Sequence, residues 1–411
     1  MASQGSLAGF RVIDLTRGLC GPFCSMQLGD AGAEVIKIEP LSGDTARSYG
    51  PPFIGDQSAV FLSLNRNKKS LAIDYANLSG RDLIRQLALS ADVVLEDMGS
   101  GKAAKLGLGY GDLAADNPRL VYCSISAFGE EGPLKDLPAA ELVIQAMAEY
   151  AASLGHIGDP PVRLGADVAS LNTGIFAAQA IFGALFHRER TGDGQRVAVN
   201  QFGSLLHLRG IMWHALSDPD DWFGFHLDHY TNPPEYGYQA KDGALYFILR
   251  RGSSEDWDRL LMELGMENVL ADPRFNDYGR QATSIGRYAP EVKPIWEAAF
   301  KDKTRAEIID LIHSIGGDAV PILDYPSLAA HPQAAAIDAL ATIDHPTAGR
   351  FQTVAPFIRF METPLAITLP PPLLGQHSRE ILAAAGVAED AIESLISNGI
   401  VMQAQMPSTR T

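Results

Sequence analysis

The sequence predicts an α/β fold with a Rossmann-like large domain, built on a mostly parallel sheet, and a smaller α/β domain. Short apolar segments recur along the first 200 residues, and segments with helical spacing lie between them. Glycines and prolines mark the turns that separate these segments. At 411 residues the chain is also too long for one simple hydrophobic core, which indicates a second domain or a large elaboration.

The first β-α-β unit is the clearest element of this pattern. Residues 10–15 are apolar and precede Gly18 and Gly21, as expected for a strand that enters a tight turn. Residues 22–31 have helical spacing and begin with a proline, which the first turn of a helix tolerates. Residues 34–39 form the second predicted strand. The N-terminus of the intervening helix would then point backbone N–H groups at an anion above the sheet.

The next elements continue the alternation of strands and helices. We expect a helix at residues 83–89, and a buried helix at residues 171–186 because that segment is apolar around most of its circumference. The further strands predicted for the large domain are residues 71–74, 93–95, 120–125 and 197–199.

The second half of the chain predicts a smaller domain and a return to the large one. Residues 217–234, rich in Asp, His, aromatic residues and Pro, indicate a linker. The predicted domains are residues 1–215 (large domain, first part), 216–328 (small domain with linkers) and 329–411 (large domain, second part). The expected elements are a strand at 244–249, helices at 255–264, 292–300 and 304–313, a β-rich return at 349–360, and helices at 378–385 and 390–397.

Charge and composition exclude several classes of function. A net charge of −16 argues against nucleic acid as a partner. We expect no membrane span, because no apolar run reaches the roughly 18–20 residues that a span needs. The first residues carry no secretory signal, and Cys20, Cys24 and Cys123 suit buried thiols of a cytoplasmic protein.

Several segments carry a specific resemblance to a known family. They are Asp14-Leu15-Thr16-Arg17, Gly32 to Pro40, Leu64 to Leu71, Arg190 to Gln195, and Pro370 to His377. Together they resemble the family III CoA-transferases, the group of formyl-CoA transferase, carnitine CoA-transferase and α-methylacyl-CoA racemase. The resemblance covers nearly the whole chain. It implies a Rossmann-like large domain, a smaller domain, and two subunits threaded through each other as linked rings.

The segment at residues 161–174 departs from the family where the chemistry takes place. The family pattern is Val-Arg-x-Gly-x-Pro-x-Ala-Asp-x-x-x-Gly, and its Asp attacks the acyl-CoA thioester to form a mixed anhydride. Alignment on Arg163, Gly165 and Gly174 puts Ser170 at the Asp position. A serine hydroxyl needs a neighbouring base, and its ester is much less activated than an anhydride or thioester. We therefore interpret Ser170 as a helix-capping residue rather than a nucleophile.

Asp167 lies three residues before that position and leaves two interpretations open. It is either a displaced nucleophile or an acidic residue at a helix N-terminus, where the helix dipole stabilises a negative charge. Three residues correspond to a rise of roughly 4.5 Å along a helix axis. A shift of that size normally abolishes catalysis, because a reacting atom must lie near 3–3.5 Å from its target.

The expected CoA-binding residues are also altered. The family's Glu-Asn-Phe-x-Pro-Gly wall is replaced by Glu96-Asp97-Met98-Gly99-Ser100-Gly101, which puts a carboxyl group beside the path of an anion. CoA or acyl-CoA is expected as a substrate, with no permanently bound cofactor. The pair His226 and His229 lacks further ligands for zinc, so no metal site is predicted. The candidate CoA-binding residues are Arg17, Lys37, Arg47, Ile73, Asp97, Gly99, Lys102 and Lys105.

A family scaffold without its nucleophile predicts the non-catalytic subunit of a heteromeric CoA-transferase. The partner would be a paralogous chain that carries the catalytic Asp, in a heterodimer or heterotetramer. The resemblance is nearest in type to succinyl-CoA:(R)-benzylsuccinate CoA-transferase of anaerobic aromatic degradation, so succinyl-CoA and benzylsuccinate are the expected substrates. Two alternatives stay open: a self-sufficient CoA-transferase that uses Asp167, and an acyl-CoA-binding or assembly protein without transferase activity.

Overall fold

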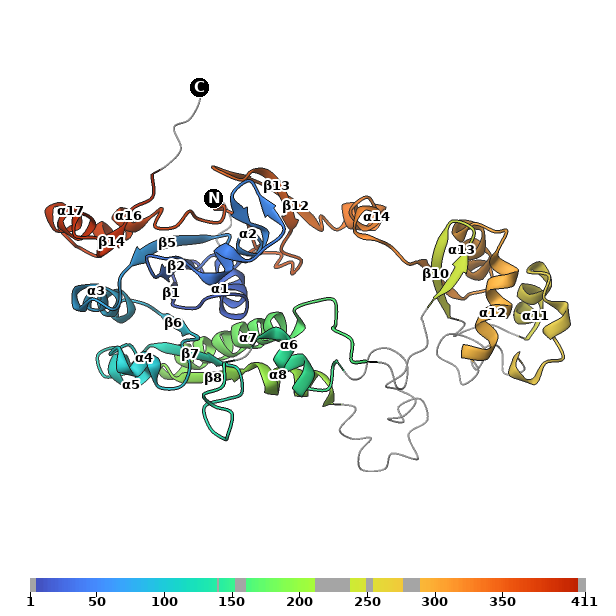
Figure 1. Cartoon of the computed structure of the whole chain (residues 1–411), viewed down its shortest axis with the longest axis horizontal. Helices are drawn as coiled ribbons and strands as arrows, with labels where there is room; N and C mark the ends of the chain where they lie inside the picture. The colour runs from blue at the N-terminus through green and yellow to red at the C-terminus, as the bar shows by residue number, and fades with distance from the viewer. Residues whose placement is uncertain are drawn as a thin grey trace, which may run out of the picture. The chain divides into compact units, whose positions relative to one another are not determined.

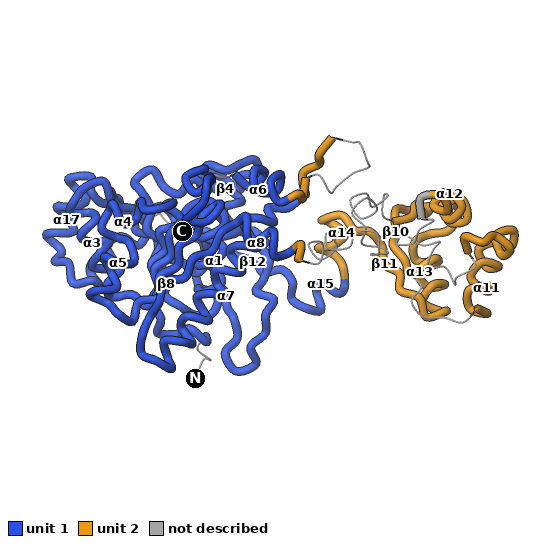
Figure 2. Tube along the Cα trace, turned by 90° about the horizontal axis from the view of Figure 1, so that it is seen from below, with its two compact units in different colours: residues 1–148, 165–208, 332–411 blue, residues 149–164, 209–331 orange. Residues whose placement is uncertain are grey.

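The chain divides into two compact units (Figures 1 and 2). The computed structural model describes residues 5–138, 140–151, 160–210, 237–248, 254–275 and 289–405. Unit 1 comprises residues 1–148, 165–208 and 332–411, and unit 2 comprises residues 149–164 and 209–331. The predicted linker at 217–234 and the two histidines considered for zinc lie outside the described residues.

A seven-stranded sheet organises unit 1. Its strand order is β14-β5-β2-β1-β6-β7-β8, and every neighbouring pair is parallel except β14, which runs antiparallel to β5. The mostly parallel α/β sheet predicted from the sequence is therefore confirmed. The strands are β1 (Arg11–Asp14), β2 (Glu34–Glu39), β5 (Lys68–Ile73), β6 (Val93–Glu96), β7 (Val121–Ser126), β8 (Arg196–Asn200) and β14 (Val401–Met402).

Successive residues of the strands pack into two different cores, because side chains alternate between the faces of a sheet. Val12 packs in the core beneath α1 (Cys20–Asp30) and α7 (Val168–Thr191). Ile13, the next residue, packs in the core beneath α3 (Leu78–Leu89), α16 (Ser378–Ala384) and α17 (Glu389–Ser397). Helices on both faces bury the sheet, as a parallel sheet requires (Figure 1).

Helix α7 extends beyond both ends of the helix predicted at residues 171–186. It is 24 residues long, and by length and hydropathy it could cross a membrane, which the sequence interpretation did not anticipate. Half of its most apolar window is nevertheless buried in unit 1, where α7 packs on α1. A Cβ at Gly174 would lie 2.7 Å from the Cys20 carbonyl oxygen, so glycine permits this close approach. We therefore describe α7 as a core helix.

The remaining elements of unit 1 lie around the sheet. The β-rich return expected at 349–360 forms a hairpin of β12 (Leu340–His345) and β13 (Gly349–Val354), and β13 ends earlier than predicted. A second hairpin joins β3 (Phe53–Ile54) and β4 (Gln57–Ser58). The other helices are α2 (Ala59–Leu64), α4 (Lys102–Lys105), α5 (Tyr110–Ala114), α6 (Glu141–Met147), α8 (Gln201–Leu208), α15 (Pro332–Ala336) and a 3₁₀ turn, Thr45–Ser48.

Unit 2 has its own aromatic core and a three-stranded antiparallel sheet in the order β11-β10-β9. Trp296 is fully buried and contacts the rings of Phe247 and Phe300, so the sheet and α12 share one core. Its elements are β9 (Tyr238–Ala240), β10 (Gly243–Ile248), β11 (Asp318–Pro321), α11 (Ser254–Glu263), α12 (Ala289–Phe300), α13 (Arg305–Ser314), α14 (Tyr325–Ala329), and 3₁₀ turns at Glu267–Val269 and Pro273–Phe275.

Candidate functional site

A cavity of about 620 Å³ opens at the carboxyl ends of the central strands of unit 1. Residues that follow β1 and residues that follow β6 form its walls. The strand order reverses between these two strands: β2 and β5 lie beyond β1, whereas β7 and β8 lie beyond β6. Such a switch point leaves a crevice between two diverging connections, and open α/β sheets bind ligands there.

The structure brings some of the predicted site residues together and separates others. Arg17, Asp97, Gly99, Lys102 and Ser170 all line the cavity. The phosphate-binding role of the two basic residues stays a prediction. Four other candidates for CoA binding, Lys37, Arg47, Ile73 and Lys105, are not among the residues that line it.

Lys37 and Arg47 stabilise the fold instead of facing the cavity, which corrects their predicted role. The Lys37 ammonium is fully buried, lies 2.7 Å from Asp44 and donates to the carbonyl of Thr16. Arg47 makes two hydrogen bonds to the buried carboxylate of Glu39. Neither cation can leave its partner without exposing a buried carboxylate, and this cost favours the paired state.

Ile73 and Lys105 are the other two candidates for CoA binding that do not line the cavity. Ile73 is the last residue of β5 and is completely buried in the core beneath α3. Lys105 is exposed on the short helix α4, one turn beyond Lys102. Ile73 therefore contributes to packing, and Lys105 is available to ligands only outside the cavity.

Ser170 lies in the first turn of α7 and is tied to a carboxylate that the sequence prediction did not include. Its hydroxyl donates to Oε2 of Glu141 at 2.7 Å, and its backbone N–H donates to the same oxygen at 2.8 Å. The Ala169 N–H and the Gln145 amide donate to the other oxygen, each at 2.8 Å. Glu141 therefore caps the N-terminus of α7, where its negative charge is favourable.

Glu141 could not have been predicted from local spacing. It lies 29 residues before Ser170, at the start of α6, and only the packing of α6 against α7 brings the two side chains together. Both residues line the cavity. A carboxyl group of this chain thus occupies the immediate surroundings of the position at which the family has Asp.

Asp167 holds the N-cap position of α7 but makes no side-chain hydrogen bond to the first turn of the helix. Glu141, from another helix, makes these contacts instead. Asp167 is not among the residues that line the cavity. Its predicted role as a displaced nucleophile therefore gains no support from its position.

Asp97 lies at the end of β6 and forms part of the cavity wall, where its carboxylate accepts from the Arg17 N–H at 3.0 Å. Burial raises the pKa of Asp97 to about 7, and the carboxylates of Asp14 and Asp44 add to the increase, whereas the Arg17 N–H and the Lys37 ammonium oppose it. The neutral form of this carboxyl group is therefore accessible near neutral pH.

Helix α1 directs an uncapped N-terminus toward the same cavity. Its N-cap residue, Leu19, offers no side-chain acceptor to the first turn, and Gly18, Leu19 and Cys20 line the cavity. The N–H groups of such a turn are suited to an anion. The cavity therefore combines backbone donors with the Arg17 and Lys102 side chains, in a chain whose overall charge is negative.

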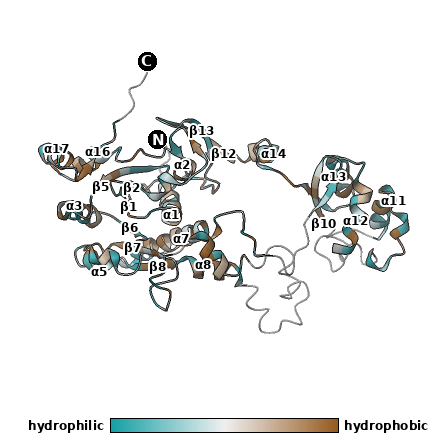
Figure 3. Cartoon of the chain, viewed as in Figure 1, coloured by the Kyte–Doolittle hydropathy of each residue, from teal (hydrophilic) through white to brown (hydrophobic). Residues whose placement is uncertain are grey.

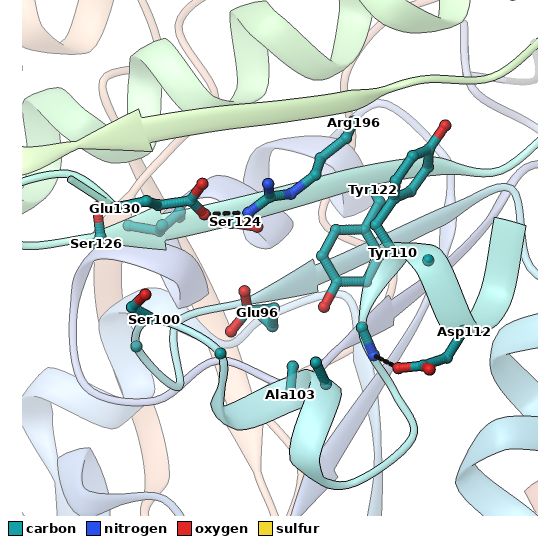
Figure 4. Close-up of a pocket in the computed structure, with 16 residues that line it drawn as sticks. Glu96, Ser100, Ala103, Tyr110, Asp112, Tyr122, Ser124, Ser126, Glu130 and Arg196 are labelled. Atoms are coloured by element: carbon teal, nitrogen blue, oxygen red, sulfur yellow. Dashed lines mark hydrogen bonds and ion pairs between the residues drawn. The ribbon is translucent and has the colours of Figure 1, made fainter.

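A second cavity of about 420 Å³ adjoins the first, and both are lined by Gly99, Ser100, Ile125 and Ser126. Figure 4 shows that Arg196 reaches across this side cavity to Glu130, with which it forms an ion pair. Glu96 and the ring of Tyr110 also face it. Acidic and hydroxyl-bearing residues make up half of the lining, and its one cation, Arg196, is paired with Glu130, so the side cavity suits the uncharged part of a ligand better than a phosphate.

Comparison with known proteins decides the family. The family model described as CoA-transferase family III matches residues 7–378. The chain belongs to CoA-transferase family III. It is 32% identical to succinyl-CoA:glutarate CoA-transferase of Mus musculus, over 98% of this chain and 91% of the relative. It is 31% identical to succinate–glutarate CoA-transferase of Agrobacterium fabrum, over 92% and 95% of the respective chains.

A solved structure agrees with this assignment. A CAIB/BAIF family protein from Brucella suis superposes with a TM-score of 0.80 at 30% identity, covering 93% of this chain and all of the other. CoA-transferase activity is therefore supported by the family and by its named members, and the substrates are a CoA thioester and a carboxylic acid. Among the described residues, no group of three or more His, Cys, Asp or Glu side chains is arranged to hold a metal ion.

Proposed function

We propose that this chain is the non-catalytic subunit of a heteromeric family III CoA-transferase, whose partner is a paralogous chain with the catalytic Asp. The observation that carries the proposal is the state of Ser170. Its side chain is buried and its hydroxyl donates to Glu141, so the capping group of α7 is Glu141 and not Ser170 as predicted, and the hydroxyl is held by this carboxylate at the edge of the cavity. A carboxylate is in general a much weaker base than the alkoxide that deprotonation of a serine would produce, so the contact with Glu141 does not activate the hydroxyl.

Exposed apolar side chains on unit 1 support an extensive partner surface. On α7, Ile175, Phe182 and Phe186 are exposed, and Leu208 is exposed at the end of α8. Figure 3 colours much of α7 and α8 from white to brown, toward the hydrophobic end of the scale. Met361, which follows the β12–β13 hairpin, has a relative exposure of 85%. Exposed apolar patches mark protein interfaces when their side chains lie together. We propose that this apolar surface is covered in a linked-ring heterodimer or heterotetramer.

The proposed acyl donor is succinyl-CoA, and the proposed acceptor is a second dicarboxylic acid. Succinyl and glutarate groups appear in the names of the relatives from Mus musculus and Agrobacterium fabrum. The resemblance to the two-chain enzymes favours benzylsuccinate. Glutarate and benzylsuccinate are therefore the two acceptors to compare. We propose a cytoplasmic location, since the three cysteines are free thiols, as a reducing compartment would keep them.

The test compares the purified chain with the same chain co-expressed with an Asp-bearing family III paralogue. We expect CoA exchange between succinyl-CoA and either acid from the pair, and none from the single chain. Hydroxylamine trapping followed by peptide mass spectrometry then locates the acylated carboxyl group. Full activity of the single chain would defeat the proposal.

A second candidate is a self-sufficient transferase that uses Glu141. One observation favours it over the Asp167 alternative: the Glu141 carboxylate lies 2.7 Å from the Ser170 hydroxyl and lines the cavity. In this case the single chain would be active, the trapped group would be on Glu141, and Glu141→Gln would abolish transfer. A third outcome, binding of CoA without exchange in any combination, would indicate an acyl-CoA-binding protein.

A further inference from the structure

Asp97 is an acid in a cavity that otherwise suits an anion. It lies beside Arg17 on the wall formed by the ends of β1 and β6, and Lys102 lines the same wall. In the described part of the chain, the one hydrogen bond assigned to its carboxyl group comes from the Arg17 N–H, which approaches both oxygens at 3.0 and 3.3 Å. Asp97 is partly exposed and lines the cavity, so its carboxyl group is accessible to a ligand there.

The charges behind Asp97 make an ionised carboxylate unfavourable there. The carboxylates of Asp14 on β1 and Asp44 repel it, whereas the Lys37 ammonium on β2 attracts it but is itself held by Asp44. On α1, the neighbouring Cys20 thiol has a pKa raised by burial and by Asp97 itself. The other charged residues that line the cavity are Arg17, Lys102, Lys135, Asp136 and Glu141.

A neutral Asp97 can donate a hydrogen bond to a ligand in the cavity. A protonated carboxyl group accepts through its carbonyl oxygen and donates through its O–H. The carbonyl oxygen can keep the Arg17 N–H bond, and the O–H can turn toward a bound oxyanion or carbonyl. An ionised Asp97 can only accept, so it repels the same ligand.

We infer that Asp97 binds CoA as a neutral hydrogen-bond donor, so that the protein takes up a proton at this residue when CoA enters the cavity. The inference rests on the proposed function, because it requires that this cavity holds CoA. If only the neutral form binds, the affinity follows the neutral fraction of Asp97. That fraction decreases about tenfold from pH 6 to pH 8 for a group half protonated near pH 7.

Titration calorimetry with CoA tests the inference on the wild-type chain and on Asp97→Asn, whose amide keeps one acceptor and one donor in place of the neutral acid. We expect the wild-type affinity to be about tenfold weaker at pH 8 than at pH 6. Asp97→Asn should change by less than about twofold over the same range. Asp82→Asn, on the exposed surface of α3, is the matched control and should keep the wild-type pH dependence. Parallel titrations with dephospho-CoA, which lacks the 3′-phosphate, show whether the ionisation of that phosphate contributes to the pH dependence.

A second measurement requires no variant. At pH 7, calorimetry in two buffers of different ionisation enthalpy should show net proton uptake of up to about one proton per CoA bound, because the ionised fraction of Asp97 must take up a proton on binding. Equal pH dependence in wild type and Asp97→Asn, or no proton uptake, would overturn the inference while leaving CoA binding intact. The absence of CoA binding at every pH in both proteins would instead overturn the assignment of the cavity, and the inference with it.

Discussion

Replacing Ser170 with alanine separates a structural role from a chemical one. The change removes the hydrogen bond from the hydroxyl to Glu141 at 2.7 Å and leaves the backbone N–H bond to the same oxygen at 2.8 Å. A hydrogen bond to a charged group contributes about 1.5–3 kcal/mol, and the surviving partner favours the lower end. We therefore expect the free energy of unfolding of unit 1 to decrease by about 1.5 kcal/mol, or roughly tenfold in the equilibrium constant.

Two assays measure the two roles. Denaturant unfolding followed by circular dichroism reports the stability, and CoA exchange by the co-expressed pair reports the chemistry. We expect the Ser170→Ala pair to keep its rate within a factor of about three, because the nucleophile is on the other chain. A loss of about a hundredfold in exchange with unchanged stability would refute this reasoning and assign a chemical role to Ser170.

Three further predictions concern packing, buried charge and pH. Gly174→Ala should lower the free energy of unfolding by about 1–3 kcal/mol, because its Cβ would lie 2.7 Å from a carbonyl oxygen of α1. Gly183→Ala, on the same helix but with open space around it, should raise it by up to about 1 kcal/mol, and thermal unfolding compares the two variants. Asp30→Ala should lower the free energy of unfolding, measured with denaturant, by about 3–5 kcal/mol, because it leaves the buried Arg66 guanidinium without its carboxylate. A decrease of less than about 1 kcal/mol is the value of an exposed ion pair and would contradict a buried one. The pKa of Asp97 is about 7 in the folded state, against a reference value of 3.8, so between these values the folded state binds more protons than the unfolded state. The stability of the wild type should therefore fall, relative to Asp97→Asn, as the pH rises from about 4 to about 7. Parallel stability curves across this range would contradict the prediction.

The sequence predicted the large domain well because its signals are local. Residues 34–39, for example, carry the β-branched Val35, Ile36 and Ile38 directly before Pro40, and the structure gives β2 the same bounds. The helix predicted at 22–31 is α1, Cys20–Asp30, because the proline near its start is a local signal. The hairpin at 340–354 was only partly anticipated, since its pairing depends on a turn rather than on apolar periodicity.

The site was less predictable because it depends on contacts between distant segments. Lys37 resembles a phosphate-binding residue in the sequence, but the structure buries it beside Asp44. Glu141 carries no local mark of its contact with Ser170, which arises from the packing of α6 on α7. Residue type therefore indicated the chemistry available to the chain, whereas only the fold determined which charges meet in the cavity and which neutralise each other beneath it.

The most direct test of the missing nucleophile is the exchange rate of the purified single chain with succinyl-CoA and glutarate or benzylsuccinate, measured beside the pair that contains an Asp-bearing paralogue. We expect exchange from the pair and a background rate from the single chain. A single chain that transfers CoA as fast as the pair, with an acylated Glu141 recovered by trapping, would show that this polypeptide carries its own nucleophile.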